Sequence, residues 1–254
     1  MAVPITVVIP TLDEAAHIGP CLAHLAWADE VIVADGGSRD DTVALARGAG
    51  AVVLERSGPT IAAQRNAAID IARNQWVFAL DADERFTDEL RDEVARTVRT
   101  PGHLAYQVRR RNLYLGRELT RGHWGRDWVT RLFRRDRRYV ERRVHEYLER
   151  LEDVGRLQGA LLHEPYRDLA EQLEKMNRYA RWAAEDLYDG GQRATAWRLF
   201  TRPVTRFVRA YLVEGAIGDG RRGLVSSVLG GYTAFLKYAH LWALEDARRP
   251  PSGP

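Results

Sequence analysis

Strand-like and helix-like segments alternate through the first hundred residues, and this alternation constrains the fold more than any other feature. Short apolar runs rich in β-branched residues favour strands at 6–9, 30–34, 51–54 and 76–80. Segments of helical character follow at 17–25, after 38, at 61–73 and at 87–98. Ser38 with Asp41 resembles a capping box, and Thr87 is placed to cap the fourth helix. The repeated unit predicts an α/β fold with a mostly parallel sheet flanked by helices.

The predicted strand ends deliver polar residues to one edge of this sheet. In open α/β sheets, ligands bind beyond the carboxyl ends of the strands, which here are followed by the loops after residues 9, 34, 54 and 80. These loops and the third helix carry Asp13 and Glu14, then Asp35, Gly36, Gly37 and Ser38, then Arg56, Gln64, Arg65 and Asn66, and finally Asp81, Asp83 and Glu84. Because four separate strand ends contribute, we predict one binding site at this edge.

The pattern changes after residue 100. Strand-like runs at 104–108, 129–133 and 157–162 are separated by loops rich in glycine and arginine. From Asp168 onward the spacing is helical, Pro203 is expected to interrupt the second of these helices, and a last helix is expected at 224–242. The predicted organisation is a domain over 1–166, a C-terminal helical region over 167–247 and a flexible tail over 248–254.

Composition places the chain among ordinary globular proteins. Of the 254 residues, 45% are hydrophobic and 29% are charged, which argues against long disorder. The single cysteine, Cys21, excludes an internal disulfide framework and lies among apolar residues, as a buried structural thiol would. No basic leader precedes the first apolar run, and no stretch reaches the roughly 20 apolar residues that span a bilayer. We therefore expect a cytoplasmic location.

Asp81-Ala82-Asp83 is the sharpest chemical signal, because it directly follows the apolar run at 76–80. Two carboxylates at a strand end can hold Mg²⁺ or Mn²⁺ together with waters and phosphate oxygens. Such an ion would neutralise charge on a departing diphosphate. The alternative is that Asp83 and Glu84 only favour the N-terminus of the next helix. The triplet alone does not separate these two interpretations.

Two further segments point to a nucleoside or phosphate ligand. Gly36 and Gly37 would let the backbone approach a ligand closely, and Asp35 could accept hydrogen bonds from a base or ribose. Arg65 could contact phosphate through two parallel hydrogen bonds. The alternatives are a tight turn before a capped helix at 35–38 and a solvent-exposed helical arginine at position 65.

Together, these pieces resemble the family-2 glycosyltransferases with the GT-A fold. The matching segments, in chain order, are 7–14, 27–38, 64–66, 80–84, 131–134 and 144–146. Two later segments, 161–163 and 235–238, are similar to one branch, the bacterial lipopolysaccharide-core β-glucosyltransferase-like proteins. The chain departs from the family pattern at Asp13, where asparagine is usual, and at Gly36, where serine is frequent. The resemblance implies an inverting transferase that takes a hexose, with glucose favoured, from a nucleotide-diphosphate donor, with UDP favoured.

The resemblance also implies which residues form the donor site. Residues 1–100 would bind the nucleotide sugar, and residues 101–166 would face the acceptor. The implied nucleotide-sugar contacts are Pro10, Thr11, Asp13, Glu14, Asp35, Gly36, Ser38, Gln64, Arg65, Asn66, Asp81 and Ala82. The implied ligands of Mg²⁺ or Mn²⁺ are Asp83, Asp81 and His163, and the alternative for His163 is a packed histidine at a strand end.

An inverting transfer is a direct displacement that needs a base for the acceptor hydroxyl and good alignment of the reacting groups. Glu146 is the candidate base because it follows the arginine-rich segment, with His145 to orient it, and Asp127 is the alternative base. Glu146 could equally form a surface ion pair with Arg142 or Arg143.

The expected acceptor is an anionic glycan or lipid-linked glycan of the cell envelope. Trp124 lies in a glycine-containing loop and could stack on a sugar ring, and Arg126 and Arg131 suit a negatively charged acceptor. The C-terminal helices mix arginine with aromatic residues, which favours contact with an anionic membrane surface, such as the inner face of the plasma membrane. The alternative is a helix packed on the catalytic domain with solvated arginines.

Two other classes of function compete with this one. A basic nucleic-acid-binding module would explain the arginines clustered between Arg109 and Arg143. The acidic strand-end loops would repel phosphate, however, so no nucleic-acid partner is expected. A nucleotidyltransferase also uses a parallel sheet and paired acids, but it would need a glycine-rich phosphate loop after the first strand, where the chain has Thr11-Leu12-Asp13-Glu14.

Overall fold

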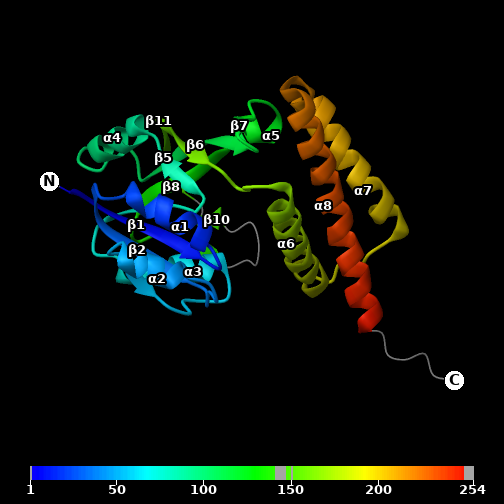
Figure 1. Cartoon of the computed structure of the whole chain (residues 1–254), viewed down its shortest axis with the longest axis horizontal. Coiled ribbons are helices and arrows are strands. Elements are labelled where there is room, and N and C mark those ends of the chain that lie inside the picture. The colour runs from blue at the N-terminus through cyan, green and yellow to red at the C-terminus, as the bar shows by residue number, and fades with distance from the viewer. Residues whose placement is uncertain (1, 141–146, 150, 249–254) are drawn as a thin grey trace. The chain divides into compact units, whose positions relative to one another are not determined.

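The computed structural model describes residues 2–140, 147–149 and 151–248, and the chain divides into two compact units. Unit 1 comprises Met1–Arg111 and Asp127–Glu164, and unit 2 comprises Asn112–Arg126 and Pro165–Pro254. Unit 1 ends at Glu164, close to the predicted domain boundary at 166. Segment 112–126, however, belongs to unit 2 and not to the first domain. Figure 1 traces the chain through both units.

Unit 1 is built on one mixed sheet. Its strands are β1 (Val3–Thr11), β2 (Ala28–Asp35), β3 (Val52–Leu54), β4 (Trp76–Ala79), β5 (Glu84–Phe86), β6 (Ala105–Tyr114), β8 (Trp128–Arg134) and β11 (Val154–His163). Their order across the sheet is β3-β2-β1-β4-β8-β6-β11-β5. The parallel pairs β1–β2, β1–β4 and β2–β3 confirm the predicted α/β core, and β8 extends it antiparallel beside β4. A separate hairpin joins β9 (Tyr139–Val140) to β10 (Tyr147–Leu148).

Among the described residues of unit 1, the main helices are α1 (Ala15–Ala23), α2 (Thr42–Gly48), α3 (Ile61–Ile71) and α4 (Asp88–Thr97). Thr87 caps α4 as predicted, because its hydroxyl accepts a hydrogen bond from the N–H of Leu90. The capping box predicted at Ser38 is wrong. The helix α2 begins only after Asp41, and the Ser38 hydroxyl instead donates to Asp35 at the strand end.

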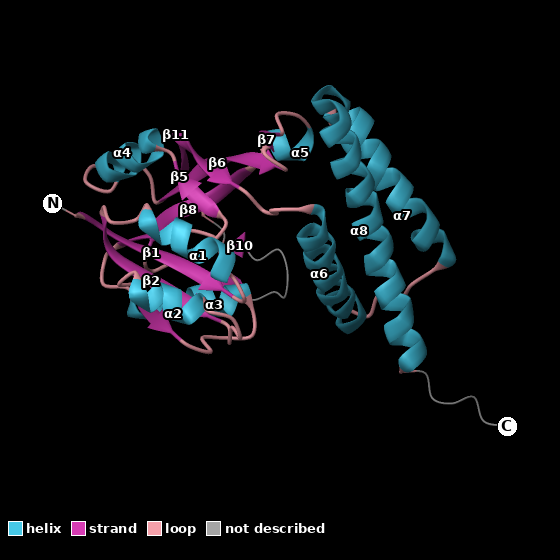
Figure 2. Cartoon of the chain, viewed as in Figure 1, coloured by secondary structure: helices cyan, strands magenta, loops and turns pink. Residues whose placement is uncertain are grey.

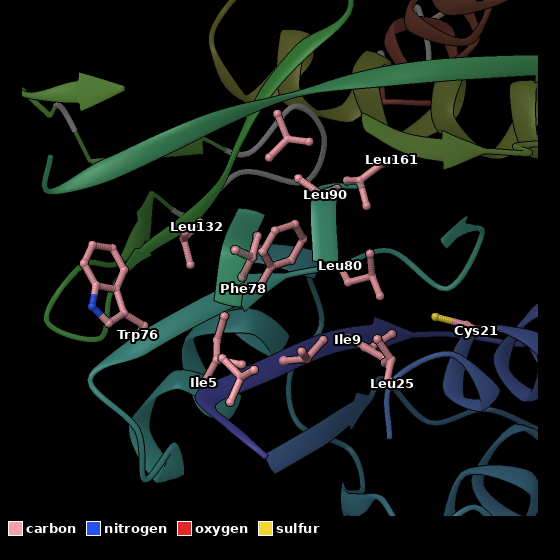
Figure 3. Packing of buried hydrophobic residues seen from close by; sticks show 14 of the residues in the cluster. Ile5, Ile9, Cys21, Leu25, Trp76, Phe78, Leu80, Leu90, Leu132 and Leu161 are labelled. Atoms are coloured by element: carbon pink, nitrogen blue, oxygen red, sulfur yellow. The ribbon is translucent and has the colours of Figure 1, made fainter. Parts of the chain in front are cut away.

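The core of unit 1 lies on both faces of the sheet, because side chains alternate along each strand. On one face, Ile5, Ile9 and Phe78 pack with residues of α1, α2 and α4 (Figure 3). On the other face, Val8 packs with residues of α3. Burial on both faces explains the continuous apolar sequence of β1, and each fully buried Ile or Phe contributes about 1.5–3 kcal/mol. Packing of helices on both faces of the sheet therefore holds in place the strand ends that carry the polar loops.

Unit 2 is mainly helical, as predicted. Figure 2 shows its main helices in cyan: α6 (Leu169–Asp189), α7 (Ala196–Val208) and α8 (Gly220–Ala247). A π-helical turn η1 (Arg209–Val213) and a 3₁₀ turn η2 (Ala216–Asp219) connect α7 to α8. Segment 112–126 adds the end of β6, the short strand β7 (Arg117–Glu118) and the one-turn helix α5 (Gly122–Gly125). In the described part of the chain, no helix has the length and apolar character needed to cross a membrane.

Pro203 lies inside α7, so the expectation that it would interrupt this helix is wrong. A proline inside a helix removes one backbone hydrogen bond and crowds the preceding turn. Here α7 packs along α8, where Gly231 has no side chain to collide with the Pro203 carbonyl. Tertiary packing therefore holds the helix continuous through the proline.

Candidate active site

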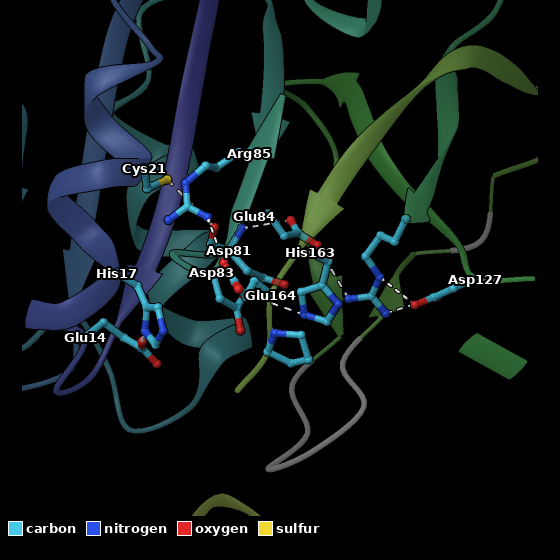
Figure 4. Close-up of polar contacts among 12 residues, drawn as sticks. Glu14, His17, Cys21, Asp81, Asp83, Glu84, Arg85, Asp127, His163 and Glu164 are labelled. Atoms are coloured by element: carbon cyan, nitrogen blue, oxygen red, sulfur yellow. Dashed lines mark hydrogen bonds and ion pairs between the residues drawn. The ribbon is translucent and has the colours of Figure 1, made fainter. Parts of the chain in front are cut away.

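The carboxyl ends of β1 and β2 meet because the strands are parallel, with Pro10 opposite Ala34 and Thr11 opposite Asp35. On the other side of β1, β4 leads into the turn that carries Asp81 and the buried Ala82, so this turn reaches the same edge. Figure 4 shows Glu14, Asp81, Asp83 and Glu84 of this region together with their neighbours. The predicted convergence of the strand-end loops is confirmed.

Asp35 is buried and organises the loop that follows β2. Its Oδ1 accepts hydrogen bonds from the hydroxyls of Thr11 (3.2 Å) and Ser38. Its Oδ2 accepts from the backbone N–H groups of Gly37 (2.8 Å) and Ser38 (2.9 Å). A carboxylate offers about four lone-pair positions, and the loop occupies all of them. A nucleoside contact through Asp35 would displace one of these donors, and that contact stays a prediction.

Gly36, where the chain departs from the family pattern, has no room for a side chain. An added Cβ would overlap Nε2 of Gln64 and would lie 3.4 Å from the carbonyl oxygen of Thr11. Gln64 is itself buried in α3 and donates to the carbonyl oxygen of Gly58 (3.3 Å). Two of the residues predicted for donor binding thus pack against each other beneath the loops.

The loops after β1 and β2 are joined by hydrogen bonds. The N–H of Asp13 donates to Oγ of Ser38 (2.9 Å), and Oδ1 of Asp13 accepts from the N–H of Arg39 (2.8 Å). Asp13 has a φ of 57°, a left-handed conformation that Asp and Asn tolerate better than other side chains do. Either residue therefore suits this position. Next to it, Oε2 of Glu14 lies 2.7 Å from Nδ1 of His17.

Asp81 forms ion pairs with two buried arginines. Arg65 contacts its Oδ1 and Arg131 contacts its Oδ2. Burial raises the pKa of Asp81, but the charges of Arg131 and Arg65 outweigh burial and hold the pKa well below the ordinary 3.8. The side chain remains 28% exposed, so part of it faces solvent. Asp81 is therefore ionised and fixed in place by two cations.

Arg65 and Asn66 of α3 both contact Tyr139. The guanidinium of Arg65 lies 4.8 Å from the centre of the Tyr139 ring and is buried, so the alternative of a solvent-exposed arginine is wrong. The side-chain amide of Asn66 donates to the carbonyl of Tyr139 (2.9 Å) and accepts from its N–H (2.8 Å). Asn66 thus holds the β9 strand, and its contact with the nucleotide stays a prediction.

A chain of alternating charges that sequence reasoning missed extends this ion-pair cluster. Glu84 is fully buried, contacts Arg131, and lies 3.5 Å from Nη1 of Arg110. Arg110 holds Asp127 through two parallel hydrogen bonds of 2.8 and 3.0 Å. The arginines stand on β6 and β8, which pair antiparallel, and β11 links these strands to β5 in the sheet. No local sequence pattern reports that pairing.

The sequence places Arg131 on the acceptor side, and that contact stays a prediction. Arg131 is buried between Asp81 and Glu84. Burial lowers the pKa of Arg131, but the charges of Asp81 and Glu84 outweigh burial and raise the pKa well above the ordinary value of arginine. Its charge is therefore balanced inside unit 1 by Asp81 and Glu84.

Asp83 and His163 are predicted metal ligands that the structure places side by side (Figure 4). Nε2 of His163 lies 3.7 Å from Oδ1 of Asp83, because β11 pairs antiparallel with β5. Among the described residues, no three His, Cys, Asp or Glu side chains group closely enough to hold a metal ion. Mg²⁺ and Mn²⁺ favour carboxylates and keep waters or substrate oxygens as further ligands. Asp83 with His163 therefore fits such an ion, and Asp81 as a third ligand stays a prediction.

Cys21 lies beneath the same turn, with its sulfur 3.9 Å from the carbonyl oxygen of Asp81. It is buried, and burial raises the pKa of its thiol far above the ordinary value of 9.0, assisted by the charge of Glu84. A protonated, buried thiol is inert, which confirms its predicted structural role.

The remaining predicted residues are spread over both units. Glu146 and His145 lie outside the described residues. Asp127 is in unit 1, held by the arginine described above. Trp124 and Arg126 belong to unit 2, where Trp124 is half-buried beside another aromatic ring and Arg126 is exposed. Their predicted acceptor contacts stay predictions.

A parallel sheet that carries an Asp-x-Asp turn at its carboxyl edge, extended by antiparallel strands that return a histidine to that turn, defines a GT-A-type glycosyltransferase. The chain belongs to the family described as Glycosyl transferase family 2, which matches residues 6–149. That span holds every predicted donor-site residue except His163. The family match confirms the predicted class, glycosyl transfer, over the two alternatives, a nucleotidyltransferase and a nucleic-acid-binding module.

Similar proteins extend the comparison beyond this family match. The chain is 28% identical to the lipopolysaccharide core biosynthesis glycosyltransferase LpsC of Rhizobium meliloti, over 98% of this chain and 96% of that protein. The crystal structure of S. aureus TarS 1-349 covers 97% of this chain and 91% of its own, with 16% identity and a TM-score of 0.49. Glucosyl-3-phosphoglycerate synthase from Mycobacterium tuberculosis aligns with 42% of this chain, at 23% identity and a TM-score of 0.36. This chain spans only 43% of the synthase.

Proposed function

We propose that this chain is a metal-dependent, inverting hexosyltransferase. It would move a hexose, with glucose favoured, from a UDP-sugar to an anionic glycan or lipid-linked acceptor of the cell envelope. One observation carries the proposal: Asp83 and His163 lie 3.7 Å apart at the sheet edge. The loops after β1 and β2 and the Arg65–Asp81 ion pair lie at that edge too.

The nucleoside would lie over the loops after β1 and β2. Thr11, Asp13 and Glu14 line the first loop, and the glycines after Asp35 keep the second loop close to the sheet. Hydrogen bonds to each other and to Asp35 hold these loops in place before any ligand arrives. A preformed site loses little entropy when it binds its ligand.

Asp83 and His163 would hold Mg²⁺ or Mn²⁺, and the bound ion would neutralise negative charge on the leaving diphosphate. The charged groups around Asp81 have a separate role that does not involve the ion. Arg65 and Arg131 keep Asp81 ionised and oriented. The part of Asp81 that stays exposed can then accept a hydrogen bond from a donor hydroxyl.

Glu146 is the proposed base, and Asp127 is the alternative. A base must approach the acceptor hydroxyl to within about 2.6–3.2 Å. Both oxygens of Asp127 accept hydrogen bonds from Arg110, at 2.8 and 3.0 Å, which restrict its movement. This restriction favours Glu146 for the proton transfer.

The proposed acceptor and location draw support from the similarity to LpsC, whose name assigns it to lipopolysaccharide core biosynthesis. Trp124 would stack on an acceptor sugar, and the exposed Arg126 would contact an acceptor anion. A lipid-linked acceptor would require contact with the membrane surface. We therefore place the enzyme on the cytoplasmic side, at the inner face of the plasma membrane.

A panel of sugar nucleotides with Mn²⁺ or Mg²⁺, scored by release of nucleoside diphosphate, tests the donor and the metal. We expect slow hydrolysis of a UDP-sugar by the wild-type protein and none by Asp83→Ala. The exposed acid Asp92 of α4, changed to Ala, is the matched control and should retain wild-type activity. Full activity of Asp83→Ala would contradict the metal role.

A further inference from the structure

Helix α7 exposes a row of apolar side chains to solvent. Of its 13 residues, all of them described, none is buried. Trp197 and Phe200 are 75% and 73% exposed, and Val204 and Val208 are also exposed. Steps of three and four residues place these four side chains on one face of an α-helix. An exposed row of this size marks an interaction surface.

The adjoining helix α8 carries a second exposed row. Leu224, Val228, Phe235 and Trp242 are exposed, and steps of four and seven residues place them on one helical face. The two helices pack against each other, and Ala194, just before α7, donates its N–H to Glu245 near the end of α8 (2.5 Å). Both helices of this pair therefore keep a large apolar surface that their mutual packing leaves uncovered.

The chain around α7 carries an excess of positive charge, although Arg209 forms an ion pair with Glu214 (2.9 Å). Residues 193–213 contain five arginines and no aspartate or glutamate. Within the residues that the structure describes, no carboxylate forms an ion pair with Arg198, Arg202 or Arg206. Burial lowers the pKa of Lys237 on α8, and the charges of Arg202 and Arg206 lower it further. An uncompensated cluster of cations lies on the same helix as the exposed apolar row.

We propose that the apolar row of α7, together with Arg198, Arg202 and Arg206, docks unit 2 on an anionic phospholipid surface. Trp197 and Phe200 would enter the boundary between headgroups and acyl chains, while the arginines contact lipid phosphates. Tryptophan is enriched at this boundary because its ring is apolar with one polar N–H. The inference rests on the proposed function, because a lipid-linked acceptor gives the enzyme a reason to reach a membrane.

Charge favours lipid over a second copy of the chain as the occupant of this face. In a symmetric dimer, the same patch meets itself, so arginines of one copy would approach those of the other. No acid lies between residues 193 and 213 to compensate, and like charges across an interface cost free energy. A surface of anionic headgroups matches both the apolar row and the charge.

The segment that carries Trp124 is fastened to the same unit. Asp219, just before α8, accepts hydrogen bonds from the N–H groups of Thr120 (3.2 Å) and Arg121 (2.9 Å). The N–H of Gly122 donates to the carbonyl of Glu214 (3.0 Å). Docking of unit 2 on lipid would therefore bring the proposed acceptor loop to the membrane with it.

Flotation of the full-length protein with vesicles tests the docking face without any sugar substrate. Wild-type protein should float with phosphatidylglycerol–phosphatidylcholine vesicles. The pair Trp197→Ser with Phe200→Ser should reduce partitioning at least about tenfold, because two large apolar side chains lose their burial in lipid. The matched control, Leu45→Ser with Ile71→Ser, changes two exposed apolar residues of unit 1 and should float like wild type.

A second pair of variants tests the charges. Arg202→Gln with Arg206→Gln should weaken partitioning into the anionic vesicles by about 25-fold, at about fivefold for each cation near the surface. The same pair should change little with pure phosphatidylcholine. Arg96→Gln with Arg99→Gln, two exposed arginines of unit 1, is the control for lost charge. Circular dichroism and the Tm confirm that each variant folds.

The outcomes separate the docking face from the proposed function. Wild-type flotation of the Trp197/Phe200 pair, or equal binding to neutral and anionic vesicles, overturns the docking proposal. A concentration-dependent dimer that this pair dissociates, with no vesicle binding, assigns the face to a second copy instead. Hydrolysis of UDP-sugar in solution reports on the donor site alone. If the wild-type protein floats with the vesicles but hydrolyses no UDP-sugar, the proposed function is contradicted and the docking face still stands.

Discussion

The acids at the carboxyl edge of the sheet are already engaged by donors of the chain. Asp35 binds its own loop, Asp81 binds two arginines, and Glu84 lies between Arg131 and Arg110. Groups held in this way keep their orientation when a ligand arrives, and electrostatic catalysis depends on such preorganisation. The same arrangement makes individual charges important for stability, because the removal of one leaves its partners buried and unbalanced.

Asp81→Asn should destabilise the protein by about 3 kcal/mol, because two buried arginines lose a shared carboxylate. The pKa of Asp81 in the folded protein is lower than 3.8, so the stabilisation by its charge is present above that value. It disappears as the pH falls toward the lowered pKa. We therefore expect the difference in free energy of unfolding between wild type and variant, measured by urea unfolding, to be smaller in acid than at neutral pH.

The control for this measurement is Asp88→Asn. Asp88 pairs with Arg91 at 2.8 Å on the surface of α4, and an exposed pair of this kind contributes at most about 1 kcal/mol. If the loss of unfolding free energy in Asp81→Asn stays constant with pH, Asp81 contributes through its shape and not through its charge.

Gly36→Ala should weaken donor binding. The added methyl would collide with the Gln64 amide, and the loop after β2 would have to move away from the sheet. We expect the KM for the UDP-sugar to rise about tenfold or more, since small misplacements of site groups have large effects. Gly19→Ala in α1 is the control, because a Cβ there meets nothing within 4 Å. Equal KM values for the two variants would exclude a role for this close packing.

At the scale of elements, the sequence predicts what short-range patterns encode. The apolar run at 6–9 lies within β1, the run at 76–80 covers β4 and one residue beyond it, and Thr87 does cap α4. It does not predict β5, a strand of three residues that exists because β11 pairs with it from more than seventy residues away. The ion pairs of Glu84 and Arg110 depend on the same long-range pairing and were missed for the same reason.

Two local signals failed because a tertiary contact had a larger effect. Pro203 predicts a helix break, but packing of α7 along α8 continues the helix through it. Ser38 predicts a helix cap, but its hydroxyl bonds to Asp35 and so holds the loop at the site. Residues whose local preference is overruled in this way are expected at sites with another function.

Gly231 and Gly230 of α8 offer a matched test of the α7–α8 packing. A Cβ on Gly231 would lie 2.9 Å from the Pro203 carbonyl oxygen, a backbone atom that cannot move alone. Gly231→Ala should therefore push the helices apart and destabilise unit 2 by about 1–3 kcal/mol. A Cβ on Gly230 meets only Nε of Arg206, at 3.9 Å, so Gly230→Ala should stabilise the helix by up to about 1 kcal/mol.

Thermal unfolding followed by circular dichroism measures both effects. Because both substitutions add the same methyl group to neighbouring positions of one helix, the difference between them isolates the contact with α7. Two variants of equal Tm would mean that α7 and α8 do not pack as closely as the structure shows.

At the scale of the whole molecule, the division into two units separates the proposed donor and acceptor functions. Unit 1 carries the strand-end loops, while segment 112–126, with Trp124, belongs to the C-terminal helices. The sequence places this segment inside the first domain, between β6 and β8. Its true partners, Glu214 and Asp219, lie about ninety residues later, and no periodic pattern links positions that far apart.

Asp219→Ala tests whether unit 2 positions the acceptor loop. The carboxylate accepts from the N–H groups of Thr120 and Arg121, and its removal should loosen the loop that leads to Trp124. We expect faster hydrogen exchange at these two amides and a KM for the acceptor that rises about tenfold. Hydrolysis of the UDP-sugar should not change, since the donor loops belong to unit 1.

The control is Asp246→Ala, which removes an exposed acid near the end of α8 and should leave both readouts at wild-type values. Faster exchange with an unchanged acceptor KM would mean that the loop is fastened by Asp219 but does not bind the acceptor. Unchanged exchange would mean that Asp219 does not hold the loop at all. Only the two changes together, with donor hydrolysis intact, assign acceptor binding to the unit that we propose docks on lipid.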